Sequence, residues 1–168
     1  RQLSPYWRWL TERVPRDDIE AYLLASDRSE RGVFKAFLRI YADRRGKAIM
    51  GEKTPAHLAY VETLLPWFPA ARLIHCMRDP RAISVSELRR RSSHAVAFPY
   101  RQLAITPPLL KRFVLLQVVW AWAGAVHRHR DLQQRYPERY RLLRFEDLVA
   151  TPDETMAGLC TFLGVEPE

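Results

Sequence analysis

The sequence of 168 residues is poor in cysteine, and its two cysteines, Cys76 and Cys160, do not have the spacing of a CxxC pair or a zinc site. Each lies in an apolar stretch, so we expect two buried thiols and no metal ligands among them. Such sparse cysteine usage excludes a disulfide framework and is typical of a reducing compartment. We therefore expect a cytoplasmic protein with no metal cofactor.

Long hydrophobic runs are also absent. The longest, residues 113–126, is interrupted by Gln117 and is shorter than the ~20 residues that a membrane-spanning helix needs. The N-terminal residues do not have the pattern of a signal peptide. The chain begins with Arg1 rather than Met and ends abruptly at FLGVEPE. We expect no membrane span and interpret the sequence as an excerpt of a longer protein.

Glycine is scarce, and none of the six glycines belongs to a GxxxxGK[ST] loop, which holds nucleotide phosphates in P-loop kinases. This absence argues against a kinase. Positive charge is what the sequence has in excess, with a net charge of +8, which indicates an anionic partner. Apart from Arg89–Arg91 the basic residues alternate with acidic ones, so we expect solvated helix faces and no nucleic acid partner. A non-catalytic module that binds polyanions or nucleotides through this basic surface is the alternative function.

Hydrophobic residues make up 48% of the chain, enough for a core, and the length fits one domain. Apolar periodicity and turn residues predict the following elements. In the first half they are a helix over 17–45 that Gly46 ends, a short buried strand over 48–50, and a helix that Thr54 caps, that Pro55 opens and that stops at Pro66 or shortly after. In the second half they are a strand over 72–77, a helix that Asp79 caps and Pro80 opens and that runs to about Arg91, a helix over 109–136, a strand over 140–145, and a helix that a capping box at 151–154 opens and Gly164 closes.

Alternation of strands and helices predicts a parallel α/β sheet, and the strand over 72–77 is apolar enough to be covered on both faces. Ligands of such sheets bind at the carboxyl ends of the strands. Two charged pairs follow predicted strands there, Glu52–Lys53 and Arg78–Asp79. The segment 92–108 contains three prolines and is predicted to be a loop, which we interpret as a candidate substrate cover.

A basic residue at a strand end, directly before a helix N-terminus, can form an anion site. Arg78 has this position, and Ser86 lies two helical turns further on. An equally good interpretation is that Arg78 pairs with Asp79 while Ser86 faces solvent. For Glu52 and Lys53 the simplest alternative is a surface ion pair worth ~0–1 kcal/mol.

Three blocks of sequence together resemble the sulfotransferases that use 3′-phosphoadenosine 5′-phosphosulfate (PAPS). They are GEKTPAHL at 51–58, FPAARLIHCMRDPRAISVS at 68–86 and YRLLRFEDLVATPDETMAGLCTFLGV at 140–165. The resemblance implies a partial P-loop NTPase-like fold, a three-layer sandwich with a parallel sheet flanked by helices. It also implies PAPS as co-substrate, its desulfonated product PAP, an unknown acceptor and no metal.

By the same resemblance, Arg78 and Ser86 hold the 3′-phosphate of the cofactor. Glu52 is the general base that removes the proton of the acceptor, and Lys53 lies near the reacting sulfuryl group. Other branches of this family use histidine as the base, and the histidines that could replace Glu52 here are His57, His75 and His94.

The sequence departs from the family pattern at both ends. It has no RSGTT-like loop for the 5′-phosphosulfate, the strand before that loop is missing with it, and no Gly/Arg-rich loop follows the last helix. We therefore expect residues 1–168 to be a single, truncated sulfotransferase domain, which leaves the activity of this segment by itself open.

Overall fold

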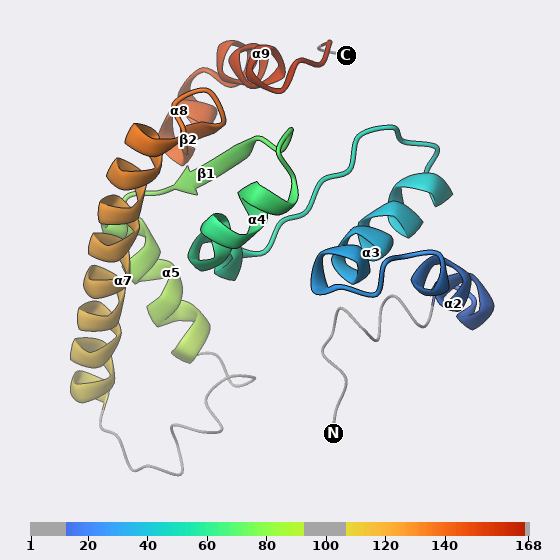
Figure 1. Ribbon diagram of the computed structural model, residues 1–168. Helices are drawn as coiled ribbons and strands as arrows, with labels where there is room; N and C mark the ends of the chain where they lie inside the picture. Colours follow the sequence, from blue (N-terminus) through green and yellow to red (C-terminus); the bar gives the residue numbers. More distant parts are fainter. Residues whose placement is uncertain (1–12, 93–106, 167–168) are drawn as a thin grey trace. The chain divides into compact units, whose positions relative to one another are not determined.

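The computed structural model describes residues 13–92 and 107–166 and divides the chain into two compact units, Arg1–Pro69 and Ala70–Glu168 (Figure 1). The elements of the first unit are α2 (Arg16–Leu24), α3 (Glu30–Arg44), the 3₁₀ helix η1 (Pro55–Tyr60) and α4 (Val61–Trp67). Those of the second are β1 (Leu73–Met77), α5 (Pro80–Ser92), α7 (Pro107–Arg135), β2 (Tyr140–Arg144), α8 (Phe145–Ala150) and α9 (Pro152–Leu163). Each unit is described by itself.

The first unit contains a small core between α2 and α3. Val14, Phe37 and Ile40 are buried in it, and partly buried apolar side chains from both helices surround them. Ile40 and Phe37 lie three residues apart on α3, so they share one face of that helix. This spacing is the apolar periodicity on which the helix prediction depends, and the prediction of helical structure in this stretch is confirmed.

The prediction of one continuous helix over 17–45 is wrong, because the chain breaks at residues 25–29. Arg28 has a φ of 58°, which a non-glycine residue adopts at a cost and which stops a helix. Ser29 then starts α3 as its N-cap, since its side chain accepts a hydrogen bond from the Gly32 N–H at 3.0 Å. The predicted end is confirmed: Gly46 follows α3 with a φ of +60°.

The strand predicted over 48–50 does not form, and Ile49 is 68% exposed. Its three residues were too few to show a period. A helix does follow Pro55, as η1 and then α4, and it ends at Trp67, one residue beyond Pro66. Thr54 precedes it without capping it, because its hydroxyl donates to the Glu52 carboxylate instead.

The second unit is built on a parallel pair of strands, β1 and β2, in which Leu73 is paired with Tyr140 and Met77 with Arg144. Helices flank this sheet, so the predicted α/β class with a parallel sheet is confirmed. Side chains of β1 alternate between half-buried and exposed, and Cys76 lies on the exposed face. The expectations that this strand is covered on both faces and that Cys76 is buried are therefore wrong.

Helix α7 is the longest element of the second unit and packs on both α5 and β2 (Figure 1). Its buried side chains, Val114, Val118 and Leu132, recur at intervals that place them on one face. The opposite face carries exposed apolar side chains, including Leu116 and Trp120. The predicted helix over 109–136 is confirmed with its limits shifted by one or two residues.

The C-terminal part adds one element that the sequence pattern did not predict, the short helix α8, which follows β2 without a loop. The final helix α9 forms as predicted and ends at Gly164, whose φ is +70°. The predicted capping box at 151–154 does not form, because the hydroxyl of Thr151 donates to the carbonyl of Asp147 rather than accepting from the first turn.

Within residues 13–92 and 107–166, none of the helices has both the length and the apolar character needed to cross a bilayer. The loop predicted over 92–108 falls mostly on residues 93–106, which lie outside the described part of the chain, as does His94.

Candidate functional site

The sequence-predicted site residues fall into two groups, one in each unit. Glu52 and Lys53 lie in the loop before η1 of the first unit, and Arg78 and Ser86 lie after β1 in the second.

In the second unit, strand register determines which residues surround Arg78. Met77 is level with Arg144. The residues that follow them, Arg78 after β1 and Phe145 after β2, therefore lie side by side at the carboxyl ends of the two strands. The guanidinium carbon of Arg78 lies 4.4 Å from the centre of the Phe145 ring, a cation–π contact. The first residue of α8, Phe145, thus packs against the guanidinium of Arg78.

The residues that follow Arg78 and Phe145 in the sequence, Asp79 and Glu146, are joined by a hydrogen bond. The backbone N–H of Asp79 donates to Oε1 of Glu146 at 2.8 Å, and this hydrogen bond lowers the pKa of Glu146. In the structure it fixes the main chain of the Arg78–Asp79 turn.

Asp79 caps α5 as predicted, because its Oδ1 accepts from the backbone N–H of Arg81 at 2.8 Å. Its carboxylate also receives the side chain of Arg81, with a shortest distance of 2.6 Å. These hydrogen bonds with Arg81 lower the pKa of Asp79 to about 2. The Asp79 carboxylate therefore already occupies the N-terminus of α5, with its charge balanced by Arg81, and an anion bound here depends on nearby side chains rather than on the helix N-terminus alone.

Of the alternative interpretation, the part in which Arg78 pairs with Asp79 does not hold, because Asp79 pairs with Arg81; the part in which Ser86 faces solvent agrees with the structure. Among the described residues, no carboxylate lies within ion-pair distance of Arg78. Ser86 is exposed on α5, whereas Ser84 is buried and donates its hydroxyl to the carbonyl of Pro80. Arg78 and Ser86 thus retain unused hydrogen-bonding groups, which suits a phosphate ligand.

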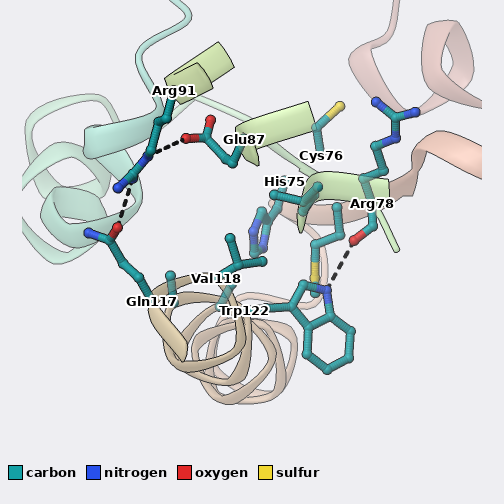
Figure 2. Close-up of a pocket in the computed structure, with 12 residues that line it drawn as sticks. His75, Cys76, Arg78, Glu87, Arg91, Gln117, Val118 and Trp122 are labelled. Carbon is teal, nitrogen blue, oxygen red and sulfur yellow. Dashed lines mark hydrogen bonds and ion pairs between the residues drawn. The ribbon is translucent and has the colours of Figure 1, made fainter. Parts of the chain in front are cut away.

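A pocket of about 370 Å³ adjoins this turn, between β1, α5 and α7 (Figure 2). Its lining is largely apolar, with Met77, Ile83 and Val118, and Arg91 donates at its rim to Glu87 and Gln117. The indole N–H of Trp122 donates to the carbonyl of Arg78 at 3.0 Å. Figure 2 shows the guanidinium of Arg78 directed away from this indole. The volume is at the lower end for small-molecule sites.

His75, one of the alternative bases, also lines this pocket, but its Nδ1 lies 2.7 Å from the hydroxyl of Tyr140. That hydroxyl lies 2.9 Å from Nδ1 of His129 as well. Burial, with the nearby charge of His129, lowers the pKa of His75, and burial raises the pKa of Tyr140. His75 is thus a half-buried histidine whose Nδ1 is already engaged by Tyr140.

In the first unit, the Glu52 carboxylate is the centre of a small hydrogen-bond network. Its Oε2 lies 2.5 Å from Nδ1 of His57, and its Oε1 accepts from the hydroxyl of Thr54 at 2.5 Å. The backbone N–H of His57 donates to the Thr54 carbonyl at 2.9 Å, which closes the first turn of η1. The turn that Pro55 opens therefore brings His57 back onto Glu52.

Lys53 is exposed beside this network. Within the part of the chain that the structure describes, it makes no ion pair with Glu52, whose partner is His57. The alternative of a Glu52–Lys53 surface pair is thus excluded, and the Lys53 ammonium stays available to an anionic ligand.

Sequence reasoning missed Phe145, Glu146 and Trp122 as supports of the Arg78 turn. A signal for the first two existed, since both residues follow the second strand, whose end must lie beside the first in a parallel pair. No sequence signal indicated Trp122. Metal-ligating side chains do not gather in groups of three or more anywhere in residues 13–92 and 107–166.

Comparison with known proteins gives two findings. The model of the sulfotransferase family matches residues 3–168. Over 138 residues the chain is 28% identical to omega-hydroxy-beta-dihydromenaquinone-9 sulfotransferase Stf3 from Mycobacterium bovis and equally to that of Mycobacterium tuberculosis, a match that covers 81% of this chain and 33% of each relative. The chain thus spans about a third of the length of these curated relatives. No solved structure matches it.

Proposed function

We propose, since this chain belongs to the sulfotransferase family, that it moves a sulfuryl group from PAPS to a hydroxyl or amine acceptor and releases PAP. Membership implies the P-loop NTPase-like fold, and the parallel strands with flanking helices are the α/β part of it. The observation that carries the proposal is the Arg78 turn, where a guanidinium without a carboxylate partner among the described residues is held in place by Phe145 and by the Glu146-anchored backbone.

The 3′-phosphate of the nucleotide is the group that Arg78 and Ser86 would hold. A guanidinium presents two parallel N–H groups to phosphate oxygens, and the Ser86 hydroxyl can donate a further hydrogen bond. Both groups are exposed and lie on the same strand-turn-helix segment.

At the acceptor side, Glu52 and Lys53 are the proposed catalytic pair. When bound, the donor supplies the sulfuryl group and a phosphate leaving group. The Lys53 ammonium would stabilise the negative charge that develops as the sulfuryl group moves. The carboxylate of Glu52, with the groups bonded to it, would provide the basic function that accepts the proton of the acceptor.

The matched relatives carry in their name an ω-hydroxylated menaquinone derivative. Of the two acceptor groups, the hydroxyl is therefore the one that we propose for this chain.

Isothermal titration of PAP into the chain tests the phosphate site. Arg78→Ala should weaken binding by roughly 10- to 150-fold, because a hydrogen bond to a charged group contributes ~1.5–3 kcal/mol. Arg90→Ala is the matched control, since Arg90 lies on the same segment, carries the same charge and is engaged with Glu87 at 2.6 Å. It should change the Kd by less than twofold.

Two results would contradict the proposal. Absence of PAP binding by the folded chain would remove its main support. Binding that falls steeply with salt and is equally strong in Arg78→Ala would favour the non-catalytic polyanion module instead.

A further inference from the structure

The Glu52 carboxylate is less available as a proton acceptor than its position in the sequence suggests. Its two oxygens are both engaged, Oε1 by the Thr54 hydroxyl and Oε2 by Nδ1 of His57, each at 2.5 Å. The Glu52 side chain is 24% exposed and the His57 side chain 31%. The imidazole of His57 is thus at least as exposed as the carboxylate of Glu52.

The hydrogen bond to Glu52 determines the tautomer of His57. A carboxylate only accepts hydrogen bonds, so the nitrogen that faces it must carry the hydrogen. Neutral imidazole has one N–H, and a hydrogen on Nδ1 leaves the lone pair on Nε2. In the described part of the chain no contact of Nε2 is seen. The ring thus has one nitrogen fixed and one open for proton transfer.

The position of the ring is fixed from a second side. Phe34 of α3 meets the His57 ring edge-on, with centroids 5.7 Å apart and an interplanar angle of 70°. Phe68, after α4, lies 5.9 Å from Phe34 and supports it. The groups facing the imidazole are thus the charged Glu52 from the loop and the uncharged Phe34 from α3. All of these residues lie in the first unit.

We infer that His57, through Nε2, is the general base of the sulfotransfer reaction and that Glu52 is its positioning residue. This inference rests on the proposed function and refines its acceptor side. As the acceptor oxygen bonds to sulfur and the bond from sulfur to the phosphate oxygen breaks, the acceptor proton goes to Nε2 and the electron pair of the broken bond stays on the phosphate. The Glu52 carboxylate then stabilises the imidazolium, as carboxylates do in catalytic triads.

Kinetics of the variants distinguish this arrangement from direct catalysis by Glu52. With PAPS as donor and 4-nitrophenol as the acceptor probe, His57→Ala should lower kcat by roughly 10²- to 10⁴-fold and leave the Kd for PAP within twofold. Glu52→Gln should lower kcat less, and the double variant should be no worse than His57→Ala, because groups that act as a unit are non-additive. His127→Ala, on an exposed histidine of α7, is the matched control.

Added imidazole should restore part of the activity of His57→Ala and leave the activity of His127→Ala unchanged, a response that a purely structural role of His57 would not give. The limb of the kcat profile at acidic pH should disappear in His57→Ala and persist in His127→Ala. A His57→Ala variant within threefold of wild type, alongside an inactive Glu52→Gln, would overturn the inference and leave the proposed function intact.

The tautomer of His57 can be tested without measuring enzymatic turnover. In ¹⁵N-labelled chain, two-dimensional NMR of the imidazole should show hydrogen on Nδ1 of His57 and a non-protonated Nε2 at neutral pH, and Glu52→Ala should redistribute the hydrogen between the two nitrogens. An Nε2–H tautomer in the wild type would overturn the inference even if 4-nitrophenol is not a substrate. Loss of PAP binding together with absence of sulfate ester would instead count against the proposed function.

Discussion

The ring of Phe145 gives a sensitive test of how the nucleotide site is preorganised. Arg78 lies with its guanidinium carbon 4.4 Å from the centre of this ring, and Phe145 is 39% exposed. A cation–π contact at such a partly exposed position contributes ~0.5–1 kcal/mol. Removing the ring in Phe145→Ala should therefore weaken PAP binding about two- to fivefold, through a less ordered Arg78, without removing any group that touches the phosphate.

A matched control exists in the same unit. Arg72 lies 5.8 Å above the ring of Phe162, so Phe162→Ala removes the same kind of pair away from the Arg78 turn. Both variants should lose about 1–2 kcal/mol of unfolding free energy, because each removes a partly buried aromatic side chain. Only Phe145→Ala should change the Kd for PAP measured by titration calorimetry.

The double variant Phe145→Ala/Arg78→Ala completes the cycle. If the ring acts through Arg78, its removal should have no further effect once Arg78 is absent. Unchanged PAP affinity in Phe145→Ala, or equal weakening in Phe162→Ala, would refute the view that the β2–α8 junction prepares Arg78 for the ligand.

Two further predictions concern stability. The N–H of Asp79 lowers the pKa of Glu146. The contribution of Glu146 to stability is therefore complete above its ordinary pKa of 4.5 and is lost as pH falls through the lower pKa of the folded state. The difference in thermal midpoint between wild type and Glu146→Gln should shrink from pH 7 to pH 3, and a constant difference would contradict this. On α7, Leu132 is fully buried and Leu116 is 72% exposed, so urea unfolding should show a loss of ~2–5 kcal/mol for Leu132→Ala and less than ~0.5 kcal/mol for Leu116→Ala, whereas equal losses would contradict the assigned buried face.

Local sequence signals predicted those elements that local physics determines. The strand over 72–77 is a continuous apolar run, and Asp79–Pro80 sets the start of α5 by capping geometry and a fixed φ. The helix break at 25–29 was missed because apolar periodicity continues on both sides of it, and only the φ of Arg28 and the cap at Ser29 reveal it. Apolar periodicity shows which face of a helix is buried, and it does not reveal a break in the helix when the same spacing continues on both sides.

Two threonines show why the capping predictions failed at 54 and 151. Each stands before a proline at the start of a helix, the pattern of an N-cap. A hydroxyl can also donate, however, and each found a better acceptor nearby, Thr54 in the Glu52 carboxylate and Thr151 in the Asp147 carbonyl. The competing acceptor is close in sequence in both cases, two and four residues away, but a propensity rule ranks only the cap. The Thr54 hydroxyl, which does not cap η1, instead holds the Glu52 carboxylate of the candidate site.

The register of the two strands explains why residues of two distant motifs meet at Arg78. With Met77 level with Arg144, Glu146 meets Asp79, whose backbone N–H is the last donor before proline. A shift of β2 by one residue would place Glu146 level with Arg78 or with Pro80, and Pro80 has no N–H to donate. Either shift would also turn the side chains of β2 to the opposite face of the sheet. The Asp79–Glu146 hydrogen bond and the Arg78–Phe145 contact therefore exist together in one register only. Sequence patterns within either strand leave this register undetermined, because pairing is a property of both strands at once.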